Sequence, residues 1–152
     1  DWGDGWDNVW LGTSVGSPAG FPRIVEMLKL KYSRKVKTMF ISMEPYHEEF
    51  SYGALMGLAE FDWIIVGGES GNETGKYQYR PCKLDWLLAV IQIGALADVP
   101  VFVKQLGTHL AKELKLKDRH GKDMEEWPET LRVREFPRQS TVVSFQSTVH
   151  SP

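Results

Sequence analysis

The sequence is poor in cysteine, with Cys82 as the single thiol in 152 residues. One thiol excludes an internal disulfide, and it excludes a cysteine-ligated metal cluster built by this chain alone. The four histidines show no His-x-x-x-His spacing, so the sequence predicts no metal site. A chain with a lone cysteine is expected in a reducing, cytoplasmic setting.

Long apolar runs and an excess of one charge are also missing. No segment approaches the roughly 18 apolar residues of a membrane span, and the acidic, tryptophan-rich start lacks a signal-peptide pattern. A net charge of −2 provides no basic field for a nucleic-acid backbone. Neither a membrane nor a nucleic-acid partner is therefore indicated. The apolar fraction of 42% is enough for the core of one domain.

Short apolar runs alternate with stretches in which apolar residues recur at helical spacing. The runs lie near residues 8–15, 38–43, 61–67 and 101–103, and the helical stretches near 22–32, 51–59 and 83–97. This alternation is typical of βαβ units, so it predicts an α/β fold with a parallel sheet. The run Trp63 to Val66 is apolar throughout, which favours a strand covered on both faces.

The chain changes character after Gly107. Residues 112–138 carry many charges of both signs and few apolar positions. We therefore expect residues 1–110 to form the α/β body and residues 111–139 to form an irregular, charged surface extension. Residues 140–152 show no reliable pattern and are expected to be a disordered tail.

Polar residues and glycines follow each predicted strand. Right-handed connections bring the carboxyl ends of parallel strands to one edge of the sheet, where α/β proteins bind ligands. The residues expected at this edge are Thr13, Ser14, Glu44, Gly67, Gly68, Glu69, Ser70, Lys104 and Gln105. Gly67 and Gly68 are predicted to leave backbone amides open, so that a ligand can approach closely.

These residue types fit more than one chemistry. Glu44 and Glu69 are candidates for an acid/base pair of the glycosidase kind. Alternatively, Glu69 accepts hydrogen bonds from an ammonium or a ribose hydroxyl, while the two glycine amides face a carboxylate or phosphate. Lys104 fits a catalytic role or that of a plain charge partner for a glutamate. A tight turn with a solvated Glu69 is the purely structural alternative.

Five sequence motifs occur in an order known from one protein family. They are NVWLGTSV at 8–15, FISMEP at 40–45, DWIIVGGESG at 62–71, RP at 80–81 and VFVKQLG at 101–107. On these motifs the chain resembles the phage-type, radical-SAM-like domain of unknown function found in phages and bacteria. The resemblance implies the carboxyl-terminal portion of a partial (β/α) barrel, with about four βα units.

The resemblance also implies a cofactor and a partner. The pocket would take S-adenosylmethionine or substrate, with the iron–sulfur cysteines in an amino-terminal half of the barrel that this sequence does not include. The partner would be that barrel half or a second copy of the chain. The residues expected to line the pocket are Thr13, Ser14, Glu44, Gly67, Gly68, Glu69, Ser70, Arg80, Lys104 and Gln105.

Two alternatives to this reading stay open. The first is a small α/β protein that binds a polar small molecule without catalysis, and the more distant one is a glycoside hydrolase-like barrel fragment that uses Glu44 and Glu69. The chain also departs from the family pattern in three places. Gly16 replaces a usual acidic residue, residues 46–49 replace an apolar, glycine-containing stretch, and the loop at 72–79 is longer.

Overall fold

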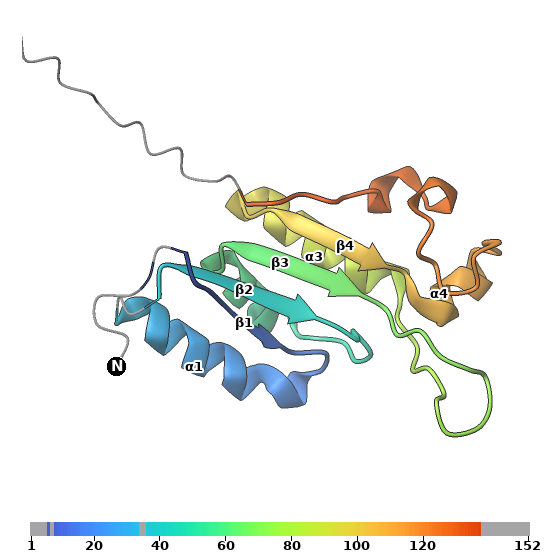
Figure 1. Cartoon of the computed structure of the whole chain (residues 1–152), viewed down its shortest axis with the longest axis horizontal. Coiled ribbons are helices and arrows are strands. Elements are labelled where there is room, and N and C mark those ends of the chain that lie inside the picture. The colour runs from blue at the N-terminus through green and yellow to red at the C-terminus, as the bar shows by residue number, and fades with distance from the viewer. Residues whose placement is uncertain (1–5, 7, 34–35, 138–152) are drawn as a thin grey trace, which may run out of the picture.

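The structure is a computed structural model that describes residues 6, 8–33 and 36–137 (Figure 1). Its four strands form one all-parallel sheet in the order β1-β2-β3-β4. The strands are β1 (Trp10–Ser14), β2 (Thr38–Met43), β3 (Trp63–Gly67) and β4 (Val101–Gln105). The predicted α/β class with a parallel sheet is therefore confirmed, and the sheet does not close into a barrel. The tail expected at 140–152 lies outside the described residues.

The predicted helices are present with altered limits. α1 (Phe21–Tyr32) follows the short 3₁₀ turn η1 (Pro18–Gly20), and α3 (Leu84–Ala97) precedes β4. The helix expected at 51–59 is α2 (Tyr52–Met56) continued by the 3₁₀ turn η2 (Gly57–Glu60). Ser51 caps α2, because its side chain accepts a hydrogen bond from the Ala54 amide at 3.3 Å.

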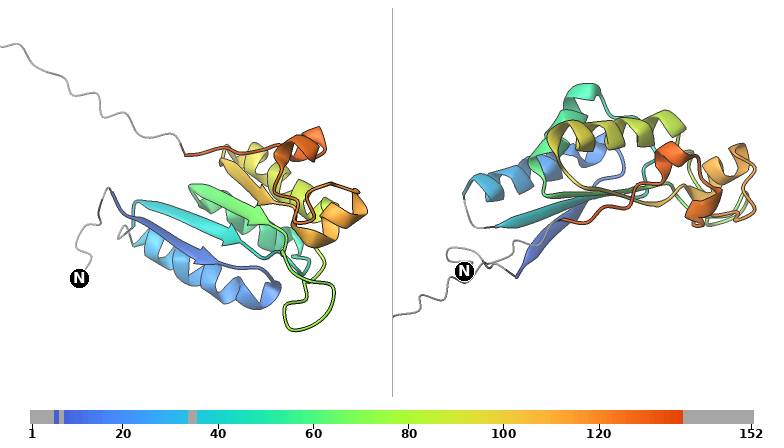
Figure 2. Two further views of the ribbon diagram at one scale, coloured as in Figure 1. Left: turned by 45° about the vertical axis from the view of Figure 1, so that its right-hand side comes forward. Right: turned by 90° about the horizontal axis from the view of Figure 1, so that it is seen from above.

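All three helices between strands lie on one face of the sheet, as Figure 2 shows in its right-hand view. That face packs alternate residues of each strand, such as Ile41, Ile64 and Val103, against the helices, and these side chains are fully buried. We call the other face the open face. Trp63 and Ile65 on the open face are only partly buried, so the prediction that β3 is covered on both faces is wrong within the described chain.

The charged segment after Gly107 packs on the body. It contains α4 (Gly107–Glu113), which the sequence did not predict, and the 3₁₀ turns η3 (Met124–Glu126) and η4 (Glu129–Leu131). Trp127 is 1% exposed and Leu131 is fully buried, so two apolar anchors hold a chain that is otherwise polar.

The segment ends in a strap, which we define as residues 133–136. The strap runs antiparallel along the outer edge of β4: Val103 donates its amide hydrogen to the Val133 carbonyl at 2.8 Å, and Glu135 donates to the Val101 carbonyl at 2.8 Å. The outer edge of β4 is therefore already paired.

Candidate functional site

Three predicted residues meet where the strands end on the open face. Glu44 follows β2, Gly67 ends β3 and Lys104 lies in β4, so Glu44 and Lys104 come from strands on either side of β3. Lys104 Nζ nevertheless donates to Glu44 Oε2 at 3.0 Å. Gly67 makes this possible, because a Cβ atom there would lie 2.7 Å from Glu44 Oε1. The ion pair thus crosses β3 over a residue without a side chain.

The two partners of this pair differ in exposure. The Glu44 side chain is 16% exposed, whereas the Lys104 side chain is 57% exposed. Glu44 is therefore the enclosed partner, and the ammonium of Lys104 reaches solvent.

A second cluster joins Glu69, Arg80 and His47 in the loops beyond the strands. Arg80 holds the Glu69 carboxylate with both sides of its guanidinium, Nε to Oε2 at 2.8 Å and Nη2 to Oε1 at 2.9 Å. These hydrogen bonds lower the pKa of Glu69 from its usual value, and Glu69 in turn raises the pKa of Arg80. Arg80, one of the predicted pocket residues, therefore lies beside Glu69 in the loops beyond β3.

His47 belongs to this cluster although the sequence did not single it out. Its Nε2 lies 2.8 Å from Arg80 Nη1. Because a guanidinium only donates hydrogen bonds, Nε2 is the acceptor in this contact. The sequence signal was the position of His47, three residues after Glu44 at the end of β2.

Backbone contacts tie the loops of the site together. Tyr46 donates its amide hydrogen to the Gly67 carbonyl at 2.9 Å, and His47 donates to the Gly16 carbonyl at 3.1 Å. A Cβ atom on Gly16 would lie 2.0 Å from the Pro45 carbonyl oxygen. A side chain at position 16 would therefore collide with the backbone of the segment that follows Glu44.

The Gly68 amide is not open to a ligand, so the prediction of open glycine amides is wrong at this residue. The Gly68 amide donates to the Gln105 carbonyl at 3.0 Å, and the Gln105 side chain donates to the Gly68 carbonyl at 3.0 Å. A Cβ atom on Gly68 would lie 2.1 Å from the Leu106 carbonyl oxygen. Gly68 therefore serves close packing of the chain after β3 against the chain after β4.

The remaining predicted hydroxyl residues do not join the hydrogen bonds of the two clusters. Ser14 and Ser70 are exposed and Thr13 is partly buried. Among the described residues, no side-chain hydrogen bond links these three hydroxyls to Glu44, Glu69 or their partners.

The chain matches a family described as "Protein of unknown function (DUF5131)" over residues 2–136. It belongs to the DUF5131 family. No curated protein and no solved structure matches the chain. Both clusters of this DUF5131 chain lie inside the matched region. Within the part that the structure describes, no helix has the length and apolar character needed to cross a membrane.

Cys82 of this DUF5131 chain does not fit a role as a cluster ligand. It is 1% exposed, and burial raises the pKa of its thiol to about 12, whereas metals bind the thiolate. Among the described residues, no group of three or more histidine, cysteine or acidic side chains is placed to hold a metal ion. An iron–sulfur cluster therefore does not fit the residues present in this chain.

A network behind the site anchors the long loop of this DUF5131 chain and was also missed from the sequence. Thr108 is 5% exposed, and its Oγ1 accepts from the Gly71 amide at 3.1 Å. The same oxygen lies 3.2 Å from His120 Nδ1. On the other side of the loop, Lys112 and Glu73 pair at 2.6 Å. Residues 71–79 are thus attached to α4.

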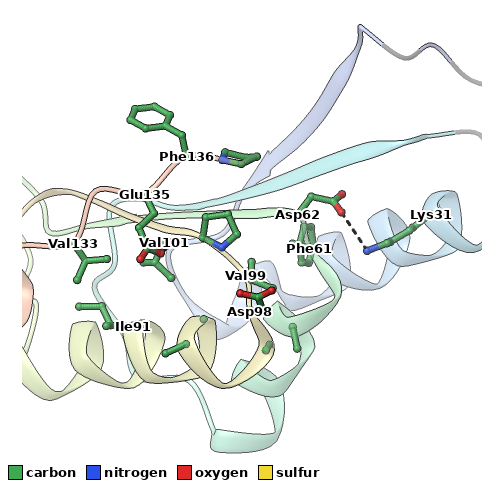
Figure 3. A pocket seen from close by; sticks show the side chains of 16 residues that line it. Lys31, Phe61, Asp62, Ile91, Asp98, Val99, Val101, Val133, Glu135 and Phe136 are labelled. Carbon is green, nitrogen blue, oxygen red and sulfur yellow. Dashed lines mark hydrogen bonds and ion pairs between the residues drawn. The ribbon is translucent and has the colours of Figure 1, made fainter. Parts of the chain in front are cut away.

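A cavity of about 910 Å³ lies at the opposite, amino-terminal edge of the strands (Figure 3). Phe61, Val99 and Val101 provide apolar walls, while Asp62, Asp98 and Glu135 contribute carboxylates. Two of these carboxylates already hold the backbone: Asp62 accepts from the Met39 amide at 2.7 Å, and Glu135 accepts from the Val101 amide at 3.1 Å. None of the predicted site residues of this DUF5131 chain lines the cavity.

Proposed function

We propose that this chain contributes one wall of a pocket for a small zwitterionic molecule, and that the molecule is S-adenosylmethionine. The Glu44–Lys104 ion pair on the open face carries this proposal. A carboxylate and an ammonium 3.0 Å apart are the complements of the α-ammonium and α-carboxylate of an amino acid. The choice of S-adenosylmethionine among zwitterionic molecules rests on the resemblance to radical-SAM-like domains.

The energetics favour exchange of this pair for a ligand. A partly exposed ion pair is worth at most about 1 kcal/mol. A charge-assisted hydrogen bond to a bound ligand contributes about 1.5 to 3 kcal/mol. Because Glu44 is mostly enclosed and Lys104 is more than half exposed, the lysine is the partner that moves when the pair opens, and both groups then face the ligand.

Chemistry on the bound ligand requires a group from elsewhere. S-adenosylmethionine supplies a reactive sulfonium, and its reductive cleavage uses an iron–sulfur cluster. The residues of this chain do not fit such a cluster, so their part in the proposal is to bind and orient. We place this activity in the cytoplasm, a setting that the lone cysteine supports.

Non-catalytic binding of another polar small molecule is the second candidate. It is favoured by the buried Cys82, which leaves the described chain without a thiolate. The glycosidase alternative is not favoured by the geometry. Glu44 and Glu69 are each paired with a cation, and the pKa of Glu69 is lowered, whereas a general acid needs a raised pKa.

The test is a calorimetric titration with S-adenosylmethionine. The sample is the complete polypeptide purified from its host. Glu44→Gln and Lys104→Met are each expected to weaken binding by roughly ten- to a hundredfold, the equivalent of one lost charge-assisted hydrogen bond. Glu26→Gln, in an exposed pair with Lys29 on α1, is the matched control and should bind like the parent.

A second ligand, 5′-methylthioadenosine, shows whether the ion pair contacts the amino acid group of S-adenosylmethionine. 5′-Methylthioadenosine lacks the amino acid group, so its affinity should be the same in parent and variants. Parental affinity for S-adenosylmethionine in both Glu44→Gln and Lys104→Met would show that the ion pair does not bind the ligand.

A further inference from the structure

Two loops meet at the carboxyl edge of the sheet. We call residues 44–50 the β2 loop and residues 69–80 the β3 loop, after the strands that they follow. Glu69 closes the β3 loop at its base, because it accepts from the Arg80 backbone amide at 2.8 Å and from the Arg80 guanidinium. The β2 loop contacts this base through His47, whose Nε2 lies 2.8 Å from Arg80 Nη1. One imidazole thus joins the two loops.

This contact requires one protonation state of His47. A guanidinium has only N–H donors, so Nε2 accepts, and the single ring proton lies on Nδ1. The imidazole that joins the loops is therefore neutral. Its side chain is 13% exposed, and the ring lies against the chain at Gly16, where an added Cβ atom would be 3.4 Å from His47 Cδ2. His47 is thus enclosed in the form that accepts from Arg80.

Protonation of His47 makes the same contact repulsive. The added proton on Nε2 points at the guanidinium, so a hydrogen bond is lost and two positive charges meet. Arg80 stays in place, because Glu69 holds it by three hydrogen bonds and is thereby occupied. The β2 loop has its own carboxylate: Glu48 Oε1 lies 3.7 Å from His47 Nδ1, and the Glu48 side chain is 60% exposed. Residues 10–20, on the other side of the ring, contain no ionisable side chain, so a charged His47 turns to Glu48.

We propose that His47 is a pH-sensitive latch between the two loops. Its neutral form joins the β2 loop to the base of the β3 loop, and its charged form pairs with Glu48 and releases the β3 loop. Histidine ordinarily changes its charge between pH 5 and pH 8, so this is the range in which the latch is tested. Because the β2 loop begins at Glu44, acid loosens the segment that carries this carboxylate. The inference goes beyond the proposed function, because it concerns the loops and requires no ligand.

A second histidine contacts an arginine in the same way but does not act as a latch. His120 Nε2 accepts from Arg119 Nε at 3.0 Å, so its ring proton lies on Nδ1 and is donated to Thr108 Oγ1 at 3.2 Å. Thr108 Oγ1 also accepts from the Gly71 amide of the β3 loop at 3.1 Å. Protonation changes Nε2 alone, and the exposed Arg119 then turns into solvent while Asp118, which accepts from the His120 amide, stays beside the ring. The bond from Nδ1 to Thr108 therefore persists in acid.

The protonation states are tested first, by NMR of the ring nitrogens in the isotope-labelled complete polypeptide at pH 8. His47 and His120 should both be neutral, with the ring proton on Nδ1. A proton on Nε2 of His47 at this pH would overturn the proposal, because Arg80 could not then donate to that nitrogen.

The release is tested by hydrogen exchange at pH 8 and pH 5, with each rate divided by the intrinsic rate at that pH. The amide of His47 donates to the Gly16 carbonyl at 3.1 Å, so it reports on the β2 loop. Its protection should fall by roughly tenfold from pH 8 to pH 5, the equivalent of one hydrogen bond to a charged group. The Gly71 amide, which donates to Thr108, should keep its protection. Equal protection of the His47 amide at the two pH values would contradict the latch.

Three variants separate the latch from general effects of acid. His47→Gln places an uncharged amide oxygen where Nε2 lies, so the amide at position 47 should be equally protected at both pH values. Glu48→Gln keeps His47 but removes its partner in acid, so the loss of protection should move to lower pH. His120→Asn keeps a donor for Thr108 and should behave like the parent.

The variants also define failure of the proposal. It is wrong if His47→Gln loses protection in acid as the parent does, if Glu48→Gln leaves the pH of the loss unchanged, or if His120→Asn abolishes the loss. None of these measurements uses S-adenosylmethionine, so a failure of ligand binding leaves their outcome unaffected.

Discussion

At the scale of single residues, Gly67 determines whether the candidate site can form. Glu44 and Lys104 reach each other only because nothing projects from the last residue of β3. The sequence marked all three residues but assigned Gly67 to ligand approach. The glycine instead serves an ion pair between two strands that are not neighbours. That contact depends on the register of β2, β3 and β4, which no local pattern encodes.

Gly67→Ala should separate the pair. The new Cβ atom would lie 2.7 Å from Glu44 Oε1 and 3.0 Å from the Gln105 carbonyl oxygen, and backbone leaves little room to adjust. We expect a loss of about 1 to 3 kcal/mol in the free energy of unfolding, measured by urea denaturation. Gly53→Ala on α2 is the control, because nothing lies within 4 Å of its added Cβ atom. It should be neutral or stabilising by up to about 1 kcal/mol. Equal effects of the two substitutions would contradict this role of Gly67.

Glu69 should make stability depend on pH in the acidic range. Its pKa is lowered in the folded state by Arg80, from an unfolded value of about 4.3. Its contribution is therefore complete above that value and is lost as the pH falls through the folded pKa. Glu69→Gln should lower the free energy of unfolding by about 1 kcal/mol at pH 7, since Arg80 is half exposed. At a pH below both the folded and the unfolded pKa of Glu69, this contribution is absent, so the free energies of unfolding of parent and Glu69→Gln no longer differ through it.

The measurement is urea denaturation of parent and Glu69→Gln between pH 7 and pH 3. Glu26→Gln controls for the loss of a carboxylate, because both partners of its pair with Lys29 are more than 60% exposed. A constant difference between parent and Glu69→Gln over the whole range would show that Arg80 does not bind the ionised carboxylate.

At the scale of elements, one arginine adds side-chain contacts to the backbone hydrogen bonds that pair the strap with β4. The Arg134 guanidinium lies over two rings, 5.4 Å from the centre of Phe102 and 5.1 Å from the centre of Trp127. Its Nε donates to the Val103 carbonyl at 3.1 Å, and Nη2 donates to the Lys104 carbonyl at 3.0 Å. Arg134 therefore connects the strap, β4 and the buried Trp127.

Arg134→Ala should cost about 2 kcal/mol in the free energy of unfolding, from the lost ring contacts and hydrogen bonds. Arg134→Lys should recover less than half of this loss, because an ammonium lacks the planar fork that stacks and donates twice. Lys29→Ala on α1 should change stability by no more than about 0.5 kcal/mol. Thermal or urea denaturation checks all three, and a fully stable Arg134→Ala would mean that the backbone pairing of the strap with β4 holds it without the arginine.

The regular elements were predictable because each carries its own signal. The four strands are short apolar runs that end in glycine or polar residues, and α1 and α3 show the expected spacing of apolar residues. α4 was missed because its seven residues follow β4 almost directly and include Gly107. The strap was missed for a different reason. Its pairing with β4 joins residues about 30 positions apart and follows no apolar pattern.

At the scale of the whole molecule, one face of the sheet is finished and the other is not. The contiguous run in β3 suggested burial on both sides, and the structure assigns only one side to its own helices. An apolar run predicts that a strand is buried, but it does not predict which segment or polypeptide buries it. The candidate site has the same limit. The sequence predicted which polar residues lie at the carboxyl edge of the sheet, but it did not predict which of them form ion pairs with one another.

The strand order also has a consequence for synthesis. Each strand pairs with the one made just before it, so the sheet can assemble in the order in which it leaves the ribosome. Each of the four strands can therefore pair as soon as it is made. The strap is the exception, because it pairs with β4 only after α4 has also been made. The strap therefore closes the sheet late: until it docks, β4 is an exposed edge on a nascent chain. Afterwards, among the four strands that the structure describes, β1 is the one whose outer edge is unpaired.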